Sequence, residues 1–137
     1  MNALINYFAL LLTGVMLQAQ NTVEVTMTNF SSNEGTVKVG LYDSQGTWLE
    51  KEYKSADSTI ANETAKVTFI DVPDGVYAVS CFHDEDDDGV FDMYLGFMPK
   101  EDYGCSNGAT GMFGPPKWED AKFTLKKNET KLVSIKL

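Results

Sequence analysis

From residue 21 onward, apolar and polar residues alternate along most of the chain. The alternating stretches are residues 23–27, 37–41, 65–72, 76–82, 121–125 and 132–137. A period of two places every second side chain on one face, which is typical of strands with one buried side. The pattern therefore predicts an all-β fold, a single β-sandwich of about seven strands.

Turn residues separate these stretches. Residues 32–35, 43–46 and 73–75 combine Asn, Asp, Ser, Pro and Gly, which tolerate a positive φ or fix the geometry of a turn. Residues 47–54 fit either a strand or a short helical segment, and the pattern leaves both alternatives open.

One long segment, residues 93–118, departs from the alternation. It contains 26 residues with five glycines and three prolines, a composition unsuited to a regular strand or helix. It also carries five aromatic residues that need a packing surface: Tyr94, Phe97, Tyr103, Phe113 and Trp118. We therefore expect one long ordered loop that covers an end or an edge of the sandwich.

The first 20 residues differ from the rest of the chain. Residues 7–17 are uncharged and mostly apolar, and Ala19 precedes Gln20. An apolar stretch of this length followed by a small residue is typical of a signal peptide and is too short to span a bilayer. We expect a signal peptide at residues 1–20 and one domain at residues 21–137, rather than an N-terminal helix packed on the domain. The expected location is periplasmic or secreted.

The charge of the chain restricts its partners. Eleven basic and 20 acidic residues give a formal net charge of −9, and none of these residues lies in the first 20 positions. A domain this acidic disfavours nucleic acid and anionic membranes as partners. Cys81 and Cys105 could form a disulfide in an oxidising compartment, or could be two small buried residues, and both alternatives remain open.

Acidic residues cluster directly after the stretch that ends at residue 82. Six of the nine residues 84–92 are acidic, in the order D-x-D-x-D-G. In a calcium loop of this type, ligands come from alternate positions and a glycine permits the sharp turn. The ligand positions fall on Asp84, Asp86, Asp88, Val90 (through its carbonyl) and Asp92. Hard oxygen ligands in this number favour Ca²⁺ over Zn²⁺.

The acidic loop is incomplete as a local unit. Position 12, a bidentate Glu in the helical version of such loops, is Leu95 in this chain. Glu101 or Asp102 could complete the shell if the glycine-rich segment returns to the loop. The alternative is a solvated acidic turn without metal. His83, the one histidine, is interpreted as a strand-end residue or one that supports the ligands without binding the ion. Direct ligation and pH sensing are the lesser alternatives.

Five runs of sequence resemble a family of small secreted bacterial proteins catalogued as a domain of unknown function. They are residues 35–43, 69–79, 83–92, 95–107 and 113–123, and they carry the patterns HDxxxDGxxD and GxxPxExYGxSN. The resemblance implies a prealbumin-like or immunoglobulin-like sandwich, an exported bacterial protein and no particular activity. It also makes Glu101 and the pair Ser106 and Asn107 attractive partners of the acidic loop.

This chain departs from the family pattern at two places. Family members often carry Asn where it has Asp86 and Asp88, so its acidic loop is more charged than usual. They usually have apolar residues at Cys81 and Cys105, so a disulfide would be peculiar to this chain.

No arrangement in the sequence indicates catalysis. One histidine and the absence of G-x-S-x-G, P-loop and H-E-x-x-H motifs leave little from which to build an active site. We expect a non-enzymatic protein in which calcium orders the aromatic segment to bind a glycan, a peptide or an envelope protein. The expected binding surface consists of Tyr94, Phe97, Tyr103, Phe113 and Trp118. The alternative for these rings is a satellite core under the loop. The alternative is a structural domain stapled by calcium without a ligand, and hydrolysis by paired aspartates ranks below both.

Overall fold

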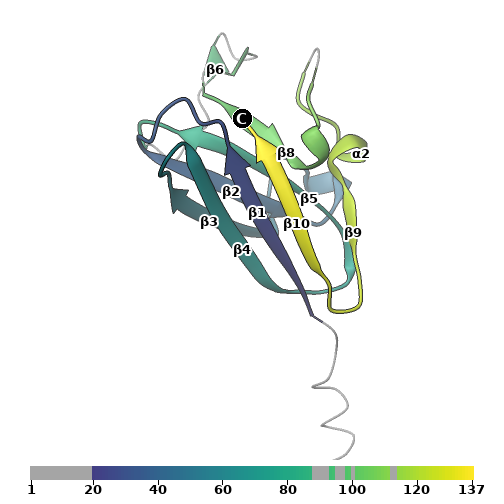
Figure 1. Cartoon of the computed structure of the whole chain (residues 1–137). Helices are drawn as coiled ribbons and strands as arrows, with labels where there is room; N and C mark the ends of the chain where they lie inside the picture. The colour runs from purple at the N-terminus through teal and green to yellow at the C-terminus, as the bar shows by residue number, and fades with distance from the viewer. Residues whose placement is uncertain (1–19, 88–92, 95–97, 100, 112–113) are drawn as a thin grey trace, which may run out of the picture.

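The computed structural model describes residues 20–87, 93–94, 98–99, 101–111 and 114–137. Two β-sheets pack face to face (Figure 1), which confirms the predicted all-β sandwich. Apart from Gln20, the expected signal peptide lies outside the described residues. No helix in the described part of the chain is long and apolar enough to cross a membrane.

The first sheet contains three strands in the order β10 (Thr130–Lys136), β1 (Asn21–Thr28) and β4 (Thr64–Val72). β1 pairs antiparallel with β4 and parallel with β10, so the two ends of the domain are neighbours in one sheet. The buried side chain of Asn21 supports this junction: its Nδ2 donates to the Val72 carbonyl at 3.0 Å, and its Oδ1 accepts from the Glu129 N–H at 2.9 Å.

The second sheet contains β3 (Lys54–Thr59), β2 (Thr36–Tyr42), β5 (Gly75–Asp84) and β8 (Tyr103–Cys105) in that order. The fifth strand, β9 (Phe123–Leu125), pairs with the beginning of β5, whereas β8 pairs with its later part. β5 is therefore the strand to which the second half of the chain returns twice.

The core lies between the two sheets, on the faces that the alternation predicts. Val23, Val25 and Met27 of β1 are fully buried, and the inward positions of β2, β4, β5 and β10 complete the cluster. Burial of these apolar side chains is the main favourable term in folding such a domain.

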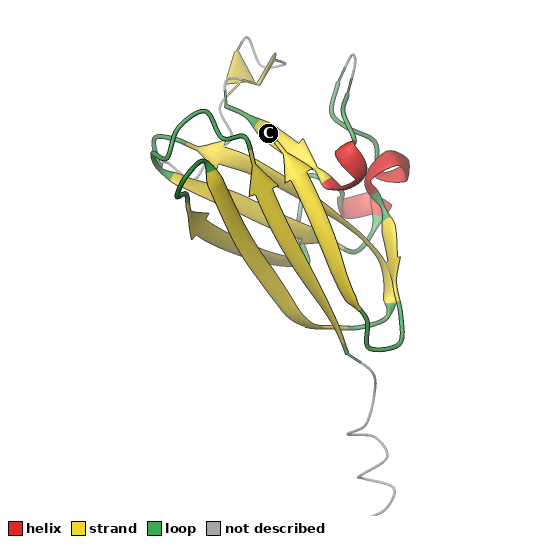
Figure 2. Cartoon of the chain, in the orientation of Figure 1, coloured by secondary structure: helices red, strands yellow, loops and turns green. Residues whose placement is uncertain are grey.

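A second, smaller cluster lies on the outer face of the five-stranded sheet. It is formed by Tyr42, Ala78, Cys105, Ala109, Trp118 and Ala121. Two short helices cover it, η2 (Ser106–Gly108) and α2 (Trp118–Ala121), which Figure 2 shows in red beside the sheets. The described part of the segment 93–118 thus covers an edge and one end of an outer face, as expected.

Two details of the predicted elements were wrong or undecided. The segment 93–118 contains strand β8, and the residue pairs β6 (Met93–Tyr94) and β7 (Met98–Pro99) bond to each other, so its composition did not exclude strands. Residues 47–54 are mostly neither of the expected alternatives: the 3₁₀ helix η1 (Gln45–Thr47) ends there, turns follow, and β3 begins at Lys54.

Candidate metal centre

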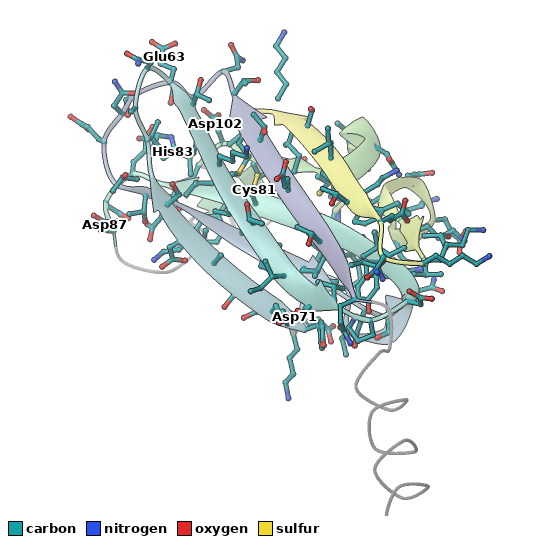
Figure 3. The ribbon with its side chains drawn as sticks, turned by 60° about the horizontal axis from the view of Figure 1, so that its bottom comes forward. Glu63, Asp71, Cys81, His83, Asp87 and Asp102 are labelled. Atoms are coloured by element: carbon teal, nitrogen blue, oxygen red, sulfur yellow. The ribbon has the colours of Figure 1, made fainter. Side chains whose placement is uncertain are left out.

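The acidic loop begins at the last residue of β5. Side chains alternate along a strand, so His83 faces the interior with Cys81, while Asp84 projects to the outer face with Phe82. Both His83 and Asp84 are 0% exposed. Figure 3 shows His83 and Asp87 at one end of the sandwich, away from Asp71 at the other end.

Three carboxylates converge at this end. One ligand oxygen each from Asp84, Asp86 and Glu101 can be chosen so that all lie within 4.8 Å of one another. The strand register explains the approach of Glu101: Tyr103 lies opposite Phe82, and the His83 N–H donates to the Asp102 carbonyl at 2.8 Å. Continuing that antiparallel register places residue 101 beside residue 84.

The backbone and neighbouring side chains hold the start of the loop. The Glu85 N–H donates to Glu101 Oε2 at 3.1 Å, which links the two halves of the site. Thr36 Oγ1 donates to Asp87 Oδ1 at 2.9 Å, and Ser31 Oγ donates to Glu85 Oε1 at 2.9 Å. The site is therefore anchored to the residues that precede and open β2.

Gly35 lets the start of β2 lie close to the backbone of Asp84 and Glu85. Its φ is +68°, and a Cβ built there would collide with the Asp84 carbonyl oxygen and lie 2.7 Å from the Glu85 carbonyl oxygen. Any larger residue would push β2 away from the acidic turn.

His83 lies beside the acidic loop and contacts the backbone of Glu34. Its Nε2 lies 2.6 Å from the Glu34 carbonyl oxygen, which can only accept, so Nε2 carries the proton. Its Nδ1 has no hydrogen-bond partner among the described residues, and Glu85 Oε1 lies 3.6 Å away. His83 is not part of the three-carboxylate cluster. His83 is the second-to-last residue of β5, which confirms the strand-end position.

The negative charge of the site extends along the sheet face. The pKa of Lys38 is raised above its ordinary value, chiefly by its hydrogen bond to Asp57, with further contributions from the charges of Asp84 and Asp87. The Lys38 Nζ lies 2.8 Å from Asp57 Oδ2.

The sequence-based ligand set is brought together in part. Asp84, Asp86 and Glu101 converge, whereas Asp88, Val90 and Asp92 lie outside the described residues. Asp102, the alternative to Glu101, is exposed and is not in the cluster.

The suggestion that Ser106 and Asn107 join the acidic loop is wrong. Ser106 Oγ accepts from the Val79 N–H at 2.9 Å and donates to the Ala121 carbonyl at 2.6 Å. Asn107 Nδ2 donates to the Lys122 carbonyl at 2.8 Å. The two residues connect η2 to β5 and to the end of α2. The amino-acid sequence could not indicate this role, because all three partners are backbone groups.

The aromatic residues expected on a binding surface differ in their fates. Trp118 is only 8% exposed and packs in the second cluster, with its ring 5.9 Å from that of Trp48, so it is a core residue. Tyr103 is half-buried on β8. Phe97, Phe113 and the side chain of Tyr94 lie outside what the structure describes.

Cys81 and Cys105 are free thiols, the second of the two alternatives that the sequence left open. In the β5–β8 register Cys81 lies opposite Gly104 and Cys105 opposite Ser80, so the two side chains project to opposite faces of the sheet. Cys81 joins the main core and Cys105 the second cluster. Burial raises the pKa of the Cys81 thiol to about 12 and that of Cys105 to about 11.

A family model described as "Uncharacterized protein conserved in bacteria (DUF2141)" matches residues 25–133. This range includes all five runs on which the resemblance was based, and the match confirms it. A search of curated proteins and one of solved structures each returned no match.

Proposed function

Because this chain belongs to a bacterial family of uncharacterized proteins, DUF2141, we propose its function from the site: an exported, non-catalytic, calcium-binding module. The observation that carries the proposal is the convergence of Asp84, Asp86 and Glu101, which come from two segments separated by more than a dozen residues. Two of these residues belong to the D-x-D-x-D-G pattern, and the third lies where the register of β8 returns the chain to it.

The charges at the site favour a bound cation. Asp84 is 0% exposed and Glu101 is 7% exposed, so both carboxylates are largely removed from water. Two like charges at roughly 4–5 Å repel by about 3–4 kcal/mol at an effective dielectric constant near 20. A divalent ion replaces this repulsion with attraction, which supports a resident cation over a solvated acidic turn.

The chemistry of the cluster favours calcium. Its three carboxylates offer only oxygen atoms, and flexible oxygen-rich shells of several carboxylates suit Ca²⁺. Asp88, the Val90 carbonyl and Asp92 are the proposed further ligands. Mg²⁺ is expected to bind more weakly because it requires a tighter octahedral shell and releases its water reluctantly.

Calcium would join both ends of the segment between Asp86 and Glu101. Closing such a loop lowers its conformational entropy and fixes the shape of the residues inside it. Those residues include Tyr94 and Phe97, which we propose as part of a surface for a periplasmic or extracellular partner. A net charge of −9 disfavours nucleic acid and anionic membranes as that partner.

Thermal melting with calcium and with a chelator tests the proposal. Calcium at about 100 times its Kd stabilises the folded state by about 2.7 kcal/mol, a rise in Tm of roughly 10 °C for a domain of this size. Asp84→Asn should abolish this calcium-dependent rise and should also raise the Tm in chelator, since it removes one of the repelling charges. Asp102→Asn, an exposed neighbour outside the cluster, is the matched control and should keep the full rise.

Two results would contradict the proposal. One is a Tm that is the same in calcium and in chelator for the wild-type chain. The other is an equal loss of the calcium effect in Asp102→Asn and Asp84→Asn. A calcium-dependent Tm in a chain that binds no partner would instead support the structural alternative, in which the ion only staples the domain.

A further inference from the structure

The outer face of the five-stranded sheet carries a groove that lies between the candidate metal centre and the second cluster. Its volume is about 320 Å³, at the lower end of the size range of small-molecule sites. Strands β2, β3 and β5 form it, and the candidate metal centre contributes no lining residue.

The groove has a floor of small residues in one cross-strand row. Gly40 of β2 lies opposite Ser55 of β3 on one side and opposite Ser80 of β5 on the other. These three positions line the groove. Since neighbouring rows carry larger side chains, the floor forms a trough that runs across the strands.

The two walls are the adjacent rows of the same face. On the side of the metal centre, Lys38 lies opposite both Asp57 and Phe82. On the other side stand Tyr42 and Glu52. Each wall therefore presents an aromatic ring and a carboxylate to the trough.

Gly40 makes room for the ring of Tyr42, whose edge lies over it. A Cβ built at this position would lie 2.9 Å from the ring of Tyr42, which is itself buried and fixed by an edge contact with Trp48 at 5.0 Å between ring centroids. Tyr42 therefore leans over the floor at Gly40, and any side chain at this position would displace the ring.

A ligand in this trough must be recognised by side chains. Within a sheet the backbone N–H and C=O groups point to neighbouring strands, so the face of the sheet cannot pair with an added peptide strand. The groups that line it are the hydroxyl of Ser55, the hydroxyl of Ser80, which also hydrogen-bonds to the Cys105 side chain, two carboxylates, the Lys38 ammonium group and two aromatic rings. This set suits a ligand with many hydroxyls and a flat apolar face, as a sugar ring has.

The charges of the groove favour a neutral ligand. Lys38 is already paired with Asp57 at 2.8 Å, which leaves Glu52 as the uncompensated charge of the lining. The acidic loop lies beyond one wall, and the chain carries a net charge of −9. An anionic ligand would be repelled by both.

We propose that this trough binds a short neutral saccharide, with its hydroxyls on Ser55, Ser80, Glu52 and Asp57 and its flat face against Phe82. The proposal goes beyond the proposed calcium function, because it names a second surface and the class of ligand that this surface binds. It does not depend on calcium, because every residue that it uses lies on β2, β3, β5 or the turn before β3.

The test applies residues 21–137, the chain without the expected signal peptide, to an array of neutral and acidic oligosaccharides. Calorimetric titration of the neutral saccharide that binds most strongly follows. Ser55→Tyr fills the floor from an exposed strand position and should raise the Kd more than about tenfold. Ser134→Tyr, an exposed serine on the outer face of β10, is the matched control and should leave the Kd unchanged. Circular dichroism melts of both variants show whether they remain folded.

Backbone amide NMR gives a second readout that needs no variant. The saccharide should shift the amide signals of Gly40, Ser55 and Ser80 and leave those of β10 in place. The proposal is overturned if no neutral saccharide binds, if only acidic saccharides bind, or if Ser134→Tyr weakens binding as much as Ser55→Tyr.

Repeating the titration in chelator separates this proposal from the calcium proposal. Saccharide binding that persists in a chain without calcium-dependent melting would overturn the calcium function and keep the trough. A calcium-dependent Tm without any saccharide binding would support the calcium function and overturn the saccharide site.

Discussion

At the scale of single residues, Gly35 is the position where the acidic turn tolerates least change. It combines a positive φ with the closest approach of any described glycine to the backbone of Asp84 and Glu85. The left-handed conformation alone costs an L residue about 1–2 kcal/mol, and the collision adds to it. Gly35 thus shapes the acidic turn although it has no side chain that could bind an ion.

Gly35→Ala should therefore lower the free energy of unfolding by more than about 1–2 kcal/mol. It should also weaken calcium binding, since β2 and the acidic turn would have to separate. Gly46→Ala is the control, because a Cβ at Gly46 meets nothing within 4 Å and its φ is not in the left-handed region. Urea denaturation of both variants compares them, and equal stabilities would refute this role of Gly35.

A buried thiol and a buried phenol make stability depend on alkaline pH. Burial raises the pKa of Cys81 from 9.0 to about 12, and that of Tyr42 from 10.0 to about 12. Each group is held neutral by the folded state, so its stabilisation is complete below the pKa of the unfolded chain. It is lost as the pH rises from about 9 toward 12.

Stability should thus fall steeply above pH 9, and Cys81→Ala should flatten the fall. Alkylation gives an independent measurement, because only the thiolate reacts: both cysteines should resist iodoacetamide at pH 8 in the native protein and react in urea. Rapid alkylation of the native chain at pH 8 would show that the thiols are not buried as described.

At the scale of elements, the clamp formed by Ser106 joins three parts of the second half of the chain. Its hydroxyl accepts from a β5 amide and donates to the last residue of α2, and Ser106 is 1% exposed. Ser106→Ala would leave two buried backbone groups without this partner, which costs about 1–3 kcal/mol.

The clamp and the metal centre are separate elements, so Ser106→Ala should lower stability and leave the Kd for calcium unchanged. Ser134→Ala on an exposed strand face should change stability by less than about 0.5 kcal/mol. A marked loss of calcium affinity in Ser106→Ala would restore the idea that this residue belongs to the acidic loop.

The elements that the pattern predicted well are those with one apolar face. β1, β2, β4, β5, β9 and β10 all overlap predicted stretches because their inward residues alternate with polar ones. β3 was missed because its residues are polar or small on both faces, as expected for an edge strand. β8 was not predicted because it contains Gly104 and lies in a segment rich in glycine and proline. Its pairing with β5 is a tertiary contact that local sequence does not encode.

In the candidate site, too, the local features could be predicted from the sequence and the tertiary contacts could not. Asp84 and Asp86 were predicted from their spacing, which is a local property of one loop. Glu101 was offered together with Asp102 as a residue that the glycine-rich segment could return to the loop, and the family resemblance added support for Glu101. Its place beside Asp84 follows from the β5–β8 register. The cross-strand row of Gly40, Ser55 and Ser80 was not predicted at all, because three residues from three strands form it.

At the scale of the whole molecule, the sandwich separates two surfaces by which it could act. The three carboxylates of Asp84, Asp86 and Glu101 converge at one end, and the trough crosses the outer face of the larger sheet. The parallel pair β1 and β10 holds the beginning and the end of the domain together on the other sheet. The two proposed functions therefore rest on the same scaffold and can be lost independently.

Calorimetric titration of Ca²⁺ into the metal-free chain decides whether the three converging carboxylates form an ion site. We expect saturable binding with one ion per chain, a higher Kd for Mg²⁺, and a Kd for calcium raised at least about tenfold in Glu101→Gln. Absence of saturable calcium binding by the wild-type chain, or unchanged affinity in Glu101→Gln, would contradict the calcium site.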